Sequence, residues 1–281
     1  MIMTGKSVLF IVVFYLVSVG NLSAFEFATG REAGLGRTMI LSQSSASVLA
    51  LVPSGGIASG EVKLELSVNR KFGMKDLDQV LFAVAYRYRR LTSSFGFAQF
   101  GHSDLYSERT ARAGVAWHIN RLTIGGSSSV MLVSFGSGYD RLSAVTYGGG
   151  VSYRTSKVIG VVSADNLSSP QLNKNSPAFN PNYSMYVEVR GVGSFSMTGR
   201  MTLEKDERPQ FALGQKMDFS KRGALFWGLS TAPLEYGGGV EAIVNNSRIC
   251  YAASYHPTLG LTQSISLSFE FGGMQREKSK G

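Results

Sequence analysis

Three side chains that could act together in hydrolysis are consecutive in the sequence: His102, Ser103 and Asp104. A catalytic triad uses these residue types, but its members come from separate elements, and three neighbours in one loop cannot reach that geometry unaided. A barrel enzyme would instead need a serine and a histidine to meet across adjacent strands. The other histidines are His118, at a predicted strand end, and His256, near a predicted loop. We therefore expect no enzymatic activity and no catalytic residues.

Metal and cofactor chemistry also lacks the residues it needs. Cys250 is the single cysteine, so the chain offers neither an internal disulfide nor a paired-thiol metal or redox motif. The glycine-rich run from Gly34 to Thr38 lacks the lysine of a phosphate-binding loop and follows no clear strand. We expect no metal and no cofactor.

Charged side chains recur on the faces of predicted strands that also carry small residues. Between residues 79 and 90, two arginines share a face with Ala83 and Ala85. Charges among small residues suit a hydrated lumen better than a packed core. They would line a solute path or hold a plug, or else provide ordinary lumen hydration and cross-strand pairing. The candidate lumen-lining residues are Lys63, Glu65, Arg87, Arg89, Arg112, Glu188, Arg190, Arg200 and Glu270.

The elements that position these charges are predicted by a strict alternation, which is clearest in the last segment. Successive side chains of a strand point to opposite faces, so this segment has one apolar and one polar face. We expect Ile265, Leu267, Phe269 and Phe271 to face lipid, and Ser264, Ser266, Ser268 and Glu270 to face the lumen. The glycine triplets 148–150 and 237–239 are interpreted as bends that curve the sheet.

About fourteen such segments follow residue 60, and the connections between them alternate between short and long. An even strand number and this alternation are typical of single-chain bacterial barrels with periplasmic turns and external loops. An open edge has no hydrogen-bond partner in a bilayer, so the first and last strands must pair. The sequence predicts an all-β fold, a closed antiparallel transmembrane β-barrel. The segments lie near 61–71, 79–90, 92–101, 109–119, 121–133, 141–153, 157–166, 183–194, 195–204, 210–218, 222–231, 236–245, 247–256 and 262–271.

Four regions follow: a signal peptide at 1–24, an N-terminal segment at 25–60, the barrel at 61–271 and a basic tail at 272–281. Lys6, an apolar stretch and Leu22-Ser23-Ala24 predict cleavage near Ala24. The alternative is an uncleaved anchor, although the apolar run is shorter than the roughly twenty residues that span a bilayer. Residues 25–60 are interpreted as a plug in the lumen, or alternatively as a loose periplasmic arm. The candidate plug motif is Arg31, Gly34, Gly36 and Arg37.

The net charge of +9 does not indicate nucleic-acid binding, because the basic residues are scattered except for three in the tail. Such charge suits loops and a lumen that meet anionic lipid or solutes. We expect outer-membrane lipid and the barrel assembly machinery as partners, no nucleic acid, and the outer membrane of a Gram-negative-type bacterium as the location.

Several short motifs together resemble the PorV/PorQ-type outer-membrane proteins, relatives of the FadL transporter fold. The resemblance implies a fourteen-stranded barrel with its N-terminal region in the lumen. It also implies a role as an accessory of type IX secretion or in passage of apolar solutes, with secretion components or such solutes as partners. The motifs are Gly34-Leu35-Gly36, Asp165-Asn166-Leu167, Leu213-Gly214-Gln215, 226–230, Gly237-Gly238-Gly239-Val240, Pro257-Thr258-Leu259-Gly260 and 264–271.

A soluble secreted all-β binding protein, such as a propeller or a large sandwich, is the alternative. It would bury its apolar faces against each other. Aromatic residues near the ends of the apolar faces fit a membrane-interface girdle and favour the barrel. They are Tyr86, Tyr88, Trp117, Trp227, Tyr251 and Tyr255.

Overall fold

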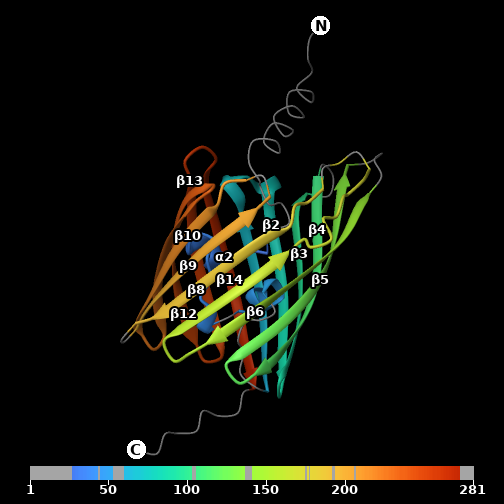
Figure 1. Ribbon diagram of the computed structural model, residues 1–281. Helices are drawn as coiled ribbons and strands as arrows, with labels where there is room; N and C mark the ends of the chain where they lie inside the picture. The colour runs from blue at the N-terminus through green and yellow to red at the C-terminus, as the bar shows by residue number, and fades with distance from the viewer. Residues whose placement is uncertain are drawn as a thin grey trace, which may run out of the picture.

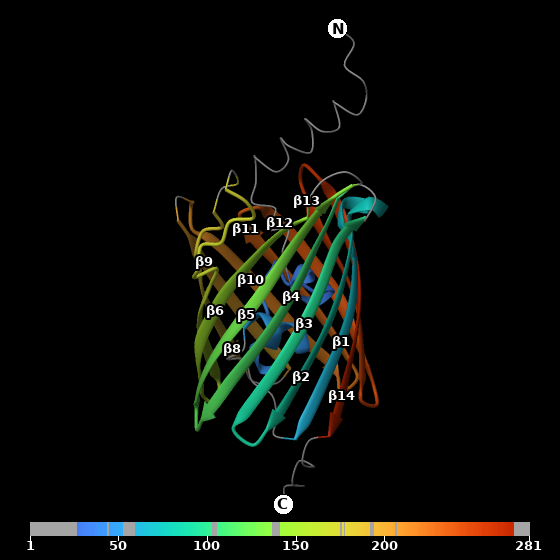
Figure 2. The ribbon, with the colours of Figure 1, turned by 90° about the vertical axis from the view of Figure 1, so that its right-hand side faces the viewer.

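The computed structural model describes residues 27–43, 45–52, 60–102, 106–136, 141–174, 176, 178–191, 194–205 and 207–272. In these residues fourteen antiparallel strands form one closed barrel (Figures 1 and 2), which confirms the predicted fold class and strand number. The strands are β1 (Glu61–Arg70), β2 (Asp78–Tyr88), β3 (Leu91–His102), β4 (Tyr106–Ile119), β5 (Leu122–Phe135), β6 (Leu142–Arg154), β7 (Val158–Asp165), β8 (Asn182–Arg190), β9 (Phe195–Glu204), β10 (Gln210–Ser220), β11 (Gly223–Thr231), β12 (Leu234–Val244), β13 (Ser247–His256) and β14 (Gly260–Gly272).

The barrel closes where the first strand pairs with the last, as the chemistry of an unpaired edge requires. The register runs from Glu61 opposite Gly272 to Arg70 opposite Gln263. Lys63 lies opposite Glu270, and its Nζ atom is 3.2 Å from the Glu270 Oε1 atom. Every strand therefore has two hydrogen-bonded neighbours.

The two ends of the barrel differ in their connections. The short-loop end carries Glu61, Gly272 and tight turns such as 89–90, 120–121 and 245–246. The long-loop end carries longer connections, among them 166–181 and the segment between β1 and β2 with η2 (Lys71–Gly73) and η3 (Lys75–Leu77). The expected alternation of short and long connections is present in part, because the connections 232–233 and 257–259 at the long-loop end are as short as those at the opposite end.

Large apolar side chains are exposed on the outward face of all fourteen strands. In β14, Ile265 is 59% exposed, whereas the flanking Ser264 and Ser266 are each 2% exposed on the inward face. The predicted aromatic positions fall near strand ends for Tyr88, Trp117 and Tyr255, but Trp227 lies in the middle of β11. The outer surface is thus apolar around the whole circumference.

Three short helices lie inside the barrel (Figures 1 and 2): α2 (Gly30–Gly34), η1 (Leu41–Gln43) and α3 (Ala46–Leu51). The Thr29 N–H donates to the Glu32 carboxylate at the start of α2, and the Ser45 hydroxyl accepts from the Val48 N–H at the start of α3. No helix of the described residues is long and apolar enough to cross a membrane. The predicted signal peptide and the tail beyond Gly272 lie outside the described residues.

Candidate functional site

Residues 27–52, which we name the lumen segment, run along the inside of the barrel and turn back. The Ala28 carbonyl accepts from Asn69 Nδ2 at 2.9 Å, near the long-loop end of β1. The Leu41 carbonyl accepts from Arg154 at 3.3 Å, at the short-loop end of β6. The Leu51 carbonyl then accepts from Arg112 at 3.2 Å, midway along β4. The segment therefore reaches deep into the lumen and contacts widely separated strands.

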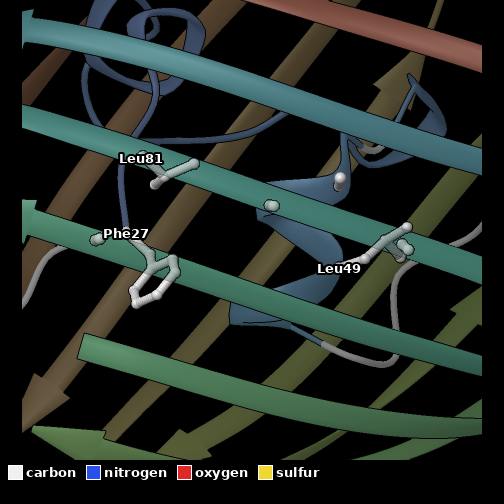
Figure 3. Packing of buried hydrophobic residues seen from close by; sticks show 7 residues of the cluster. Phe27, Leu49 and Leu81 are labelled. Carbon is white, nitrogen blue, oxygen red and sulfur yellow. The ribbon is translucent and has the colours of Figure 1, made fainter.

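Three apolar clusters join the lumen segment to the inner wall, and together they form the protein core. In the first, Phe27 and Leu49 pack against Leu81 and small residues of β2 and β3 (Figure 3). Full burial of such a side chain stabilises by about 1.5–3 kcal/mol. The second cluster comprises Met39, Leu41, Val48, Val52, Ile159, Val161 and Tyr186, and the third Leu35, Ile40, Phe226, Cys250 and Ala252.

Glycines on the inward face make room for the lumen segment. A Cβ atom on Gly237 would lie 2.5 Å from the Ala33 carbonyl oxygen and 2.7 Å from that of Gly34, and one on Gly228 would overlap the Leu35 carbonyl. The interpretation of the 237–239 triplet as a simple bend is therefore incomplete. Gly237 is needed because a backbone passes too close for any side chain.

A buried ionic cluster centres on Glu241, on the inward face of β12. Its carboxylate binds the Arg31 guanidinium of α2. Arg248 Nη1 and Lys216 Nζ lie 2.8 Å and 3.2 Å from its Oε1 atom. Both of these cations also donate to the side-chain oxygen of Gln43. One carboxylate thus links α2 to three strands, and Lys216 and Arg248 extend this link to Gln43 at the end of η1.

Arg37 and Glu235 form a second link, nearer the long-loop end. Arg37 Nε and Nη2 donate to the two carboxylate oxygens of Glu235 at 2.9 Å and 2.8 Å. This two-point geometry fixes orientation as well as distance. Both Gly36 and Arg37 have positive φ angles, 65° and 66°, where the backbone turns between α2 and the wall.

Polar contacts complete the docking of the lumen segment. The Ser47 N–H and hydroxyl donate to Glu65 at 3.1 Å and 2.7 Å, and the Ser42 N–H donates to Glu188 at 2.7 Å. Hydrogen bonds or ion pairs connect the segment to ten strands, and the apolar clusters add β2, β7 and β11. The ten are β1, β3, β4, β6, β8, β9, β10, β12, β13 and β14.

Glu32 is the unusual acid of the lumen segment. Burial, together with the nearby carboxylate of Glu65, raises its pKa from 4.5 to about 7, although its Oε2 atom accepts from Thr29. Its Oε1 atom is buried and has no hydrogen-bond partner among the described residues. The site therefore favours a protonated carboxyl group.

Docking of the lumen segment is expected to weaken as the pH rises from 4.5 to about 7. A solvated Glu32 loses its proton near pH 4.5, whereas the docked residue retains it to about pH 7. The contribution of Glu32 to docking stability is therefore complete below pH 4.5 and lost above about pH 7. Denaturant midpoints measured across this range should fall more steeply with pH in the unsubstituted chain than in Glu32→Gln. An equal slope in both proteins would contradict the assignment.

The predicted lumen-lining residues divide into three groups. Lys63, Glu65, Arg112 and Glu188 are buried on the inward face, and Arg87, Arg190, Arg200 and Glu270 are partly buried there. Arg89 is the exception, because β2 ends at Tyr88 and Arg89 is an exposed turn residue with φ 52°. Its inclusion in the lumen was wrong. Of the plug motif, Arg31 and Arg37 make the ion pairs above, and Gly34 and Gly36 pack closely against the wall.

The partners of the lumen segment are the residues that the sequence reasoning missed. Glu235, Glu241, Lys216 and Arg248 were not among the predicted lumen residues. Glu235 and Glu241 share the inward face of β12 with Gly237 and Gly239. Charged residues that alternate with the same spacing as small residues could therefore have identified them.

The histidines have structural partners. His118 is buried between the hydroxyls of Thr92 and Thr123, and the His256 ring accepts from the backbone of the 257–259 turn. His102 is exposed at the end of β3, and Ser103 and Asp104 lie outside the described residues. In the part of the chain that the structure describes, no group of three or more His, Cys, Asp or Glu residues could hold a metal ion.

No family model matches the chain, and no curated protein matches it significantly. Among solved structures, the toluene transporter TodX of Pseudomonas putida is similar with a TM-score of 0.54 and 11% identity, covering 86% of this chain and 96% of that one. A second TodX structure has a TM-score of 0.51 and 11% identity, and the match covers 81% of this chain and 92% of that one. A triple mutant of the Rhodopseudomonas blastica porin has a TM-score of 0.45 and 8% identity, and the match covers 76% of this chain and 100% of that one. At these identities the TodX likeness shows the barrel fold alone.

Proposed function

We propose that this chain is a non-enzymatic outer-membrane β-barrel that passes a solute through its lumen, with the lumen segment acting as a plug. The observation that carries the proposal is an apolar outer surface around a polar, plugged interior. Val115, Val162 and Ile265, on three different strands, are 56%, 58% and 59% exposed. Monomeric soluble proteins rarely expose a continuous apolar surface of this extent, whereas a bilayer requires it.

Transport is supported by the arrangement inside the barrel. A fourteen-stranded barrel is wide enough to need a filling, and here the filling is a separate segment rather than wall side chains alone. The strands of the wall pair only with one another, so closure of the barrel does not depend on the lumen segment. The fold is similar to that of TodX, a toluene transporter, and this similarity supports solute passage as the role of such a barrel.

Membrane residence is tested by an arginine on the outward face. Ile265→Arg is expected to cost about 2–4 kcal/mol in folding free energy, because the charge would lie near the bilayer midplane. Leu261→Arg, on the same face close to the end of β14, should cost about 0–1 kcal/mol. Urea titrations of the protein folded into lipid vesicles measure both values.

The soluble alternative makes the opposite prediction. An exposed surface substitution on a soluble protein changes stability by about 0.5 kcal/mol or less, so equal values for the two variants would support it. Cell fractionation adds an independent test: recovery in the soluble periplasm without detergent would also contradict the proposal.

The PorV/PorQ resemblance supports a second candidate role, as an accessory of type IX secretion. Part of that resemblance, Gly34-Leu35-Gly36, lies in the buried lumen segment, where close contact with the wall already accounts for both glycines. Co-purification with secretion components from the native membrane would favour this role over solute passage.

A further inference from the structure

A cleft opens at the long-loop end of the lumen, beside the start of the lumen segment. Its lining comes from both sides: from residues 28–37 of the segment, and from β1, β2, β12, β13, β14 and η2 of the wall. A solute entering from this side meets the cleft before it meets the buried clusters that hold the plug.

The cleft is polar, which sets it apart from the apolar clusters below it. Eight of its eleven lining residues carry polar side chains, and the apolar ones are two alanines and Phe72. Asn69 Nδ2 donates to the Gln79 side-chain oxygen at 3.0 Å, so two planar amides lie against each other. The two-point Arg37–Glu235 pair supplies a second planar polar surface.

One lining group is buried without a partner. Ser264 is 2% exposed, and its Oγ atom has no hydrogen-bond partner among the described residues. Burying a hydroxyl without a hydrogen bond costs free energy, so such a group calls for a partner from outside the chain. Because Ser264 lines the cleft, that partner is placed in the cleft.

We propose that this cleft binds a small uncharged polyhydroxylated solute, a monosaccharide or polyol, as the entry site of the transported molecule. Each hydroxyl of such a solute both donates and accepts, as the mixed amides, hydroxyls and carboxylate of the cleft require. The Phe72 ring at the rim provides an apolar surface for carbon-bound hydrogens. The inference rests on the proposed transport function, and it replaces the apolar solute that the family resemblance implies.

Apolar and charged solutes fit the cleft less well. An apolar solute would offer no hydrogen-bond partner to the Ser264 hydroxyl, which would stay unpaired, and none to the Asn69–Gln79 amides. A charged solute would have to displace one member of the Arg37–Glu235 ion pair, and the Lys71 ammonium already lies 5.3 Å from the centre of the Phe100 ring.

Saturation-transfer NMR on the full-length protein in detergent micelles tests the proposal, with D-glucose, toluene and acetate as separate probes. D-glucose should bind the unsubstituted protein. Gln79→Leu and Ser264→Ala should each weaken D-glucose binding roughly tenfold, because each removes a polar partner. The matched control is Thr202→Ala, which removes a buried hydroxyl that bonds to Ser184 outside the cleft and should leave binding unchanged.

Heat-modifiable gel mobility establishes that each variant is folded. Binding of toluene or acetate alone, or D-glucose binding equal in all variants, would overturn the proposal. Absence of binding by all three probes would overturn it too. In either case the vesicle-folding result for Ile265→Arg separately decides whether the barrel resides in a membrane.

Discussion

Gly237→Ala is expected to displace the lumen segment and open the barrel to ions. The added Cβ atom would lie 2.5 Å from the Ala33 carbonyl oxygen and 2.7 Å from that of Gly34, and both are backbone atoms that cannot rotate away. The wall does not depend on this contact, because Gly237 keeps its ladder partners Gly228 and Ser254. The clash therefore destabilises the docked lumen segment and not the barrel.

The neighbouring residue provides the control for this substitution. Gly238 faces outward, and a Cβ atom there would meet nothing nearer than 3.5 Å. Planar-bilayer recordings should show frequent conducting steps for Gly237→Ala and the unsubstituted level for Gly238→Ala. Equal conductance in the two variants would show that the segment does not close the barrel where the structure places it.

Glu241→Ala is expected to destabilise the docked segment by about 3–5 kcal/mol, the usual effect of removing one partner from a buried ionic network. Three cations, Arg31, Lys216 and Arg248, would lose their shared carboxylate, and Arg31 is itself buried. A denaturant titration that is monitored by heat-modifiable gel mobility measures this loss of stability.

An exposed ion pair gives the comparison for Glu241. Arg70 and Asp78 pair at 3.0 Å at the long-loop ends of β1 and β2, where the Arg70 side chain is 51% exposed. Asp78→Ala should cost no more than about 1 kcal/mol, because solvent screens the pair. If the two variants lose the same stability, the Glu241 cluster does not hold the segment.

The barrel could be predicted from the sequence because its pattern is local. The alternation of Ile265 with Ser264 and Ser266 requires only that a strand has two faces. The same alternation correctly predicted that Lys63 and Glu65 face the lumen. The prediction for Arg89 was wrong, because alternation does not show where a strand ends and a turn begins.

The interior contacts could not be predicted, because they join residues far apart in the chain. Arg31 meets Glu241 across 210 positions, and nothing near either residue indicates the other. Gly237 looked like a bend for the same reason: the backbone that excludes a side chain there belongs to α2. The cleft, likewise, combines residues 28–37 with five strands and η2.

The central claim is that residues 27–52 close the lumen of a membrane barrel, and planar-bilayer conductance tests it most directly. The measurement compares the unsubstituted protein with a chain lacking this segment, after both have shown heat-modifiable mobility. We predict a nearly silent unsubstituted barrel and steady conducting steps after the deletion. Equal conductance before and after the deletion would contradict the claim.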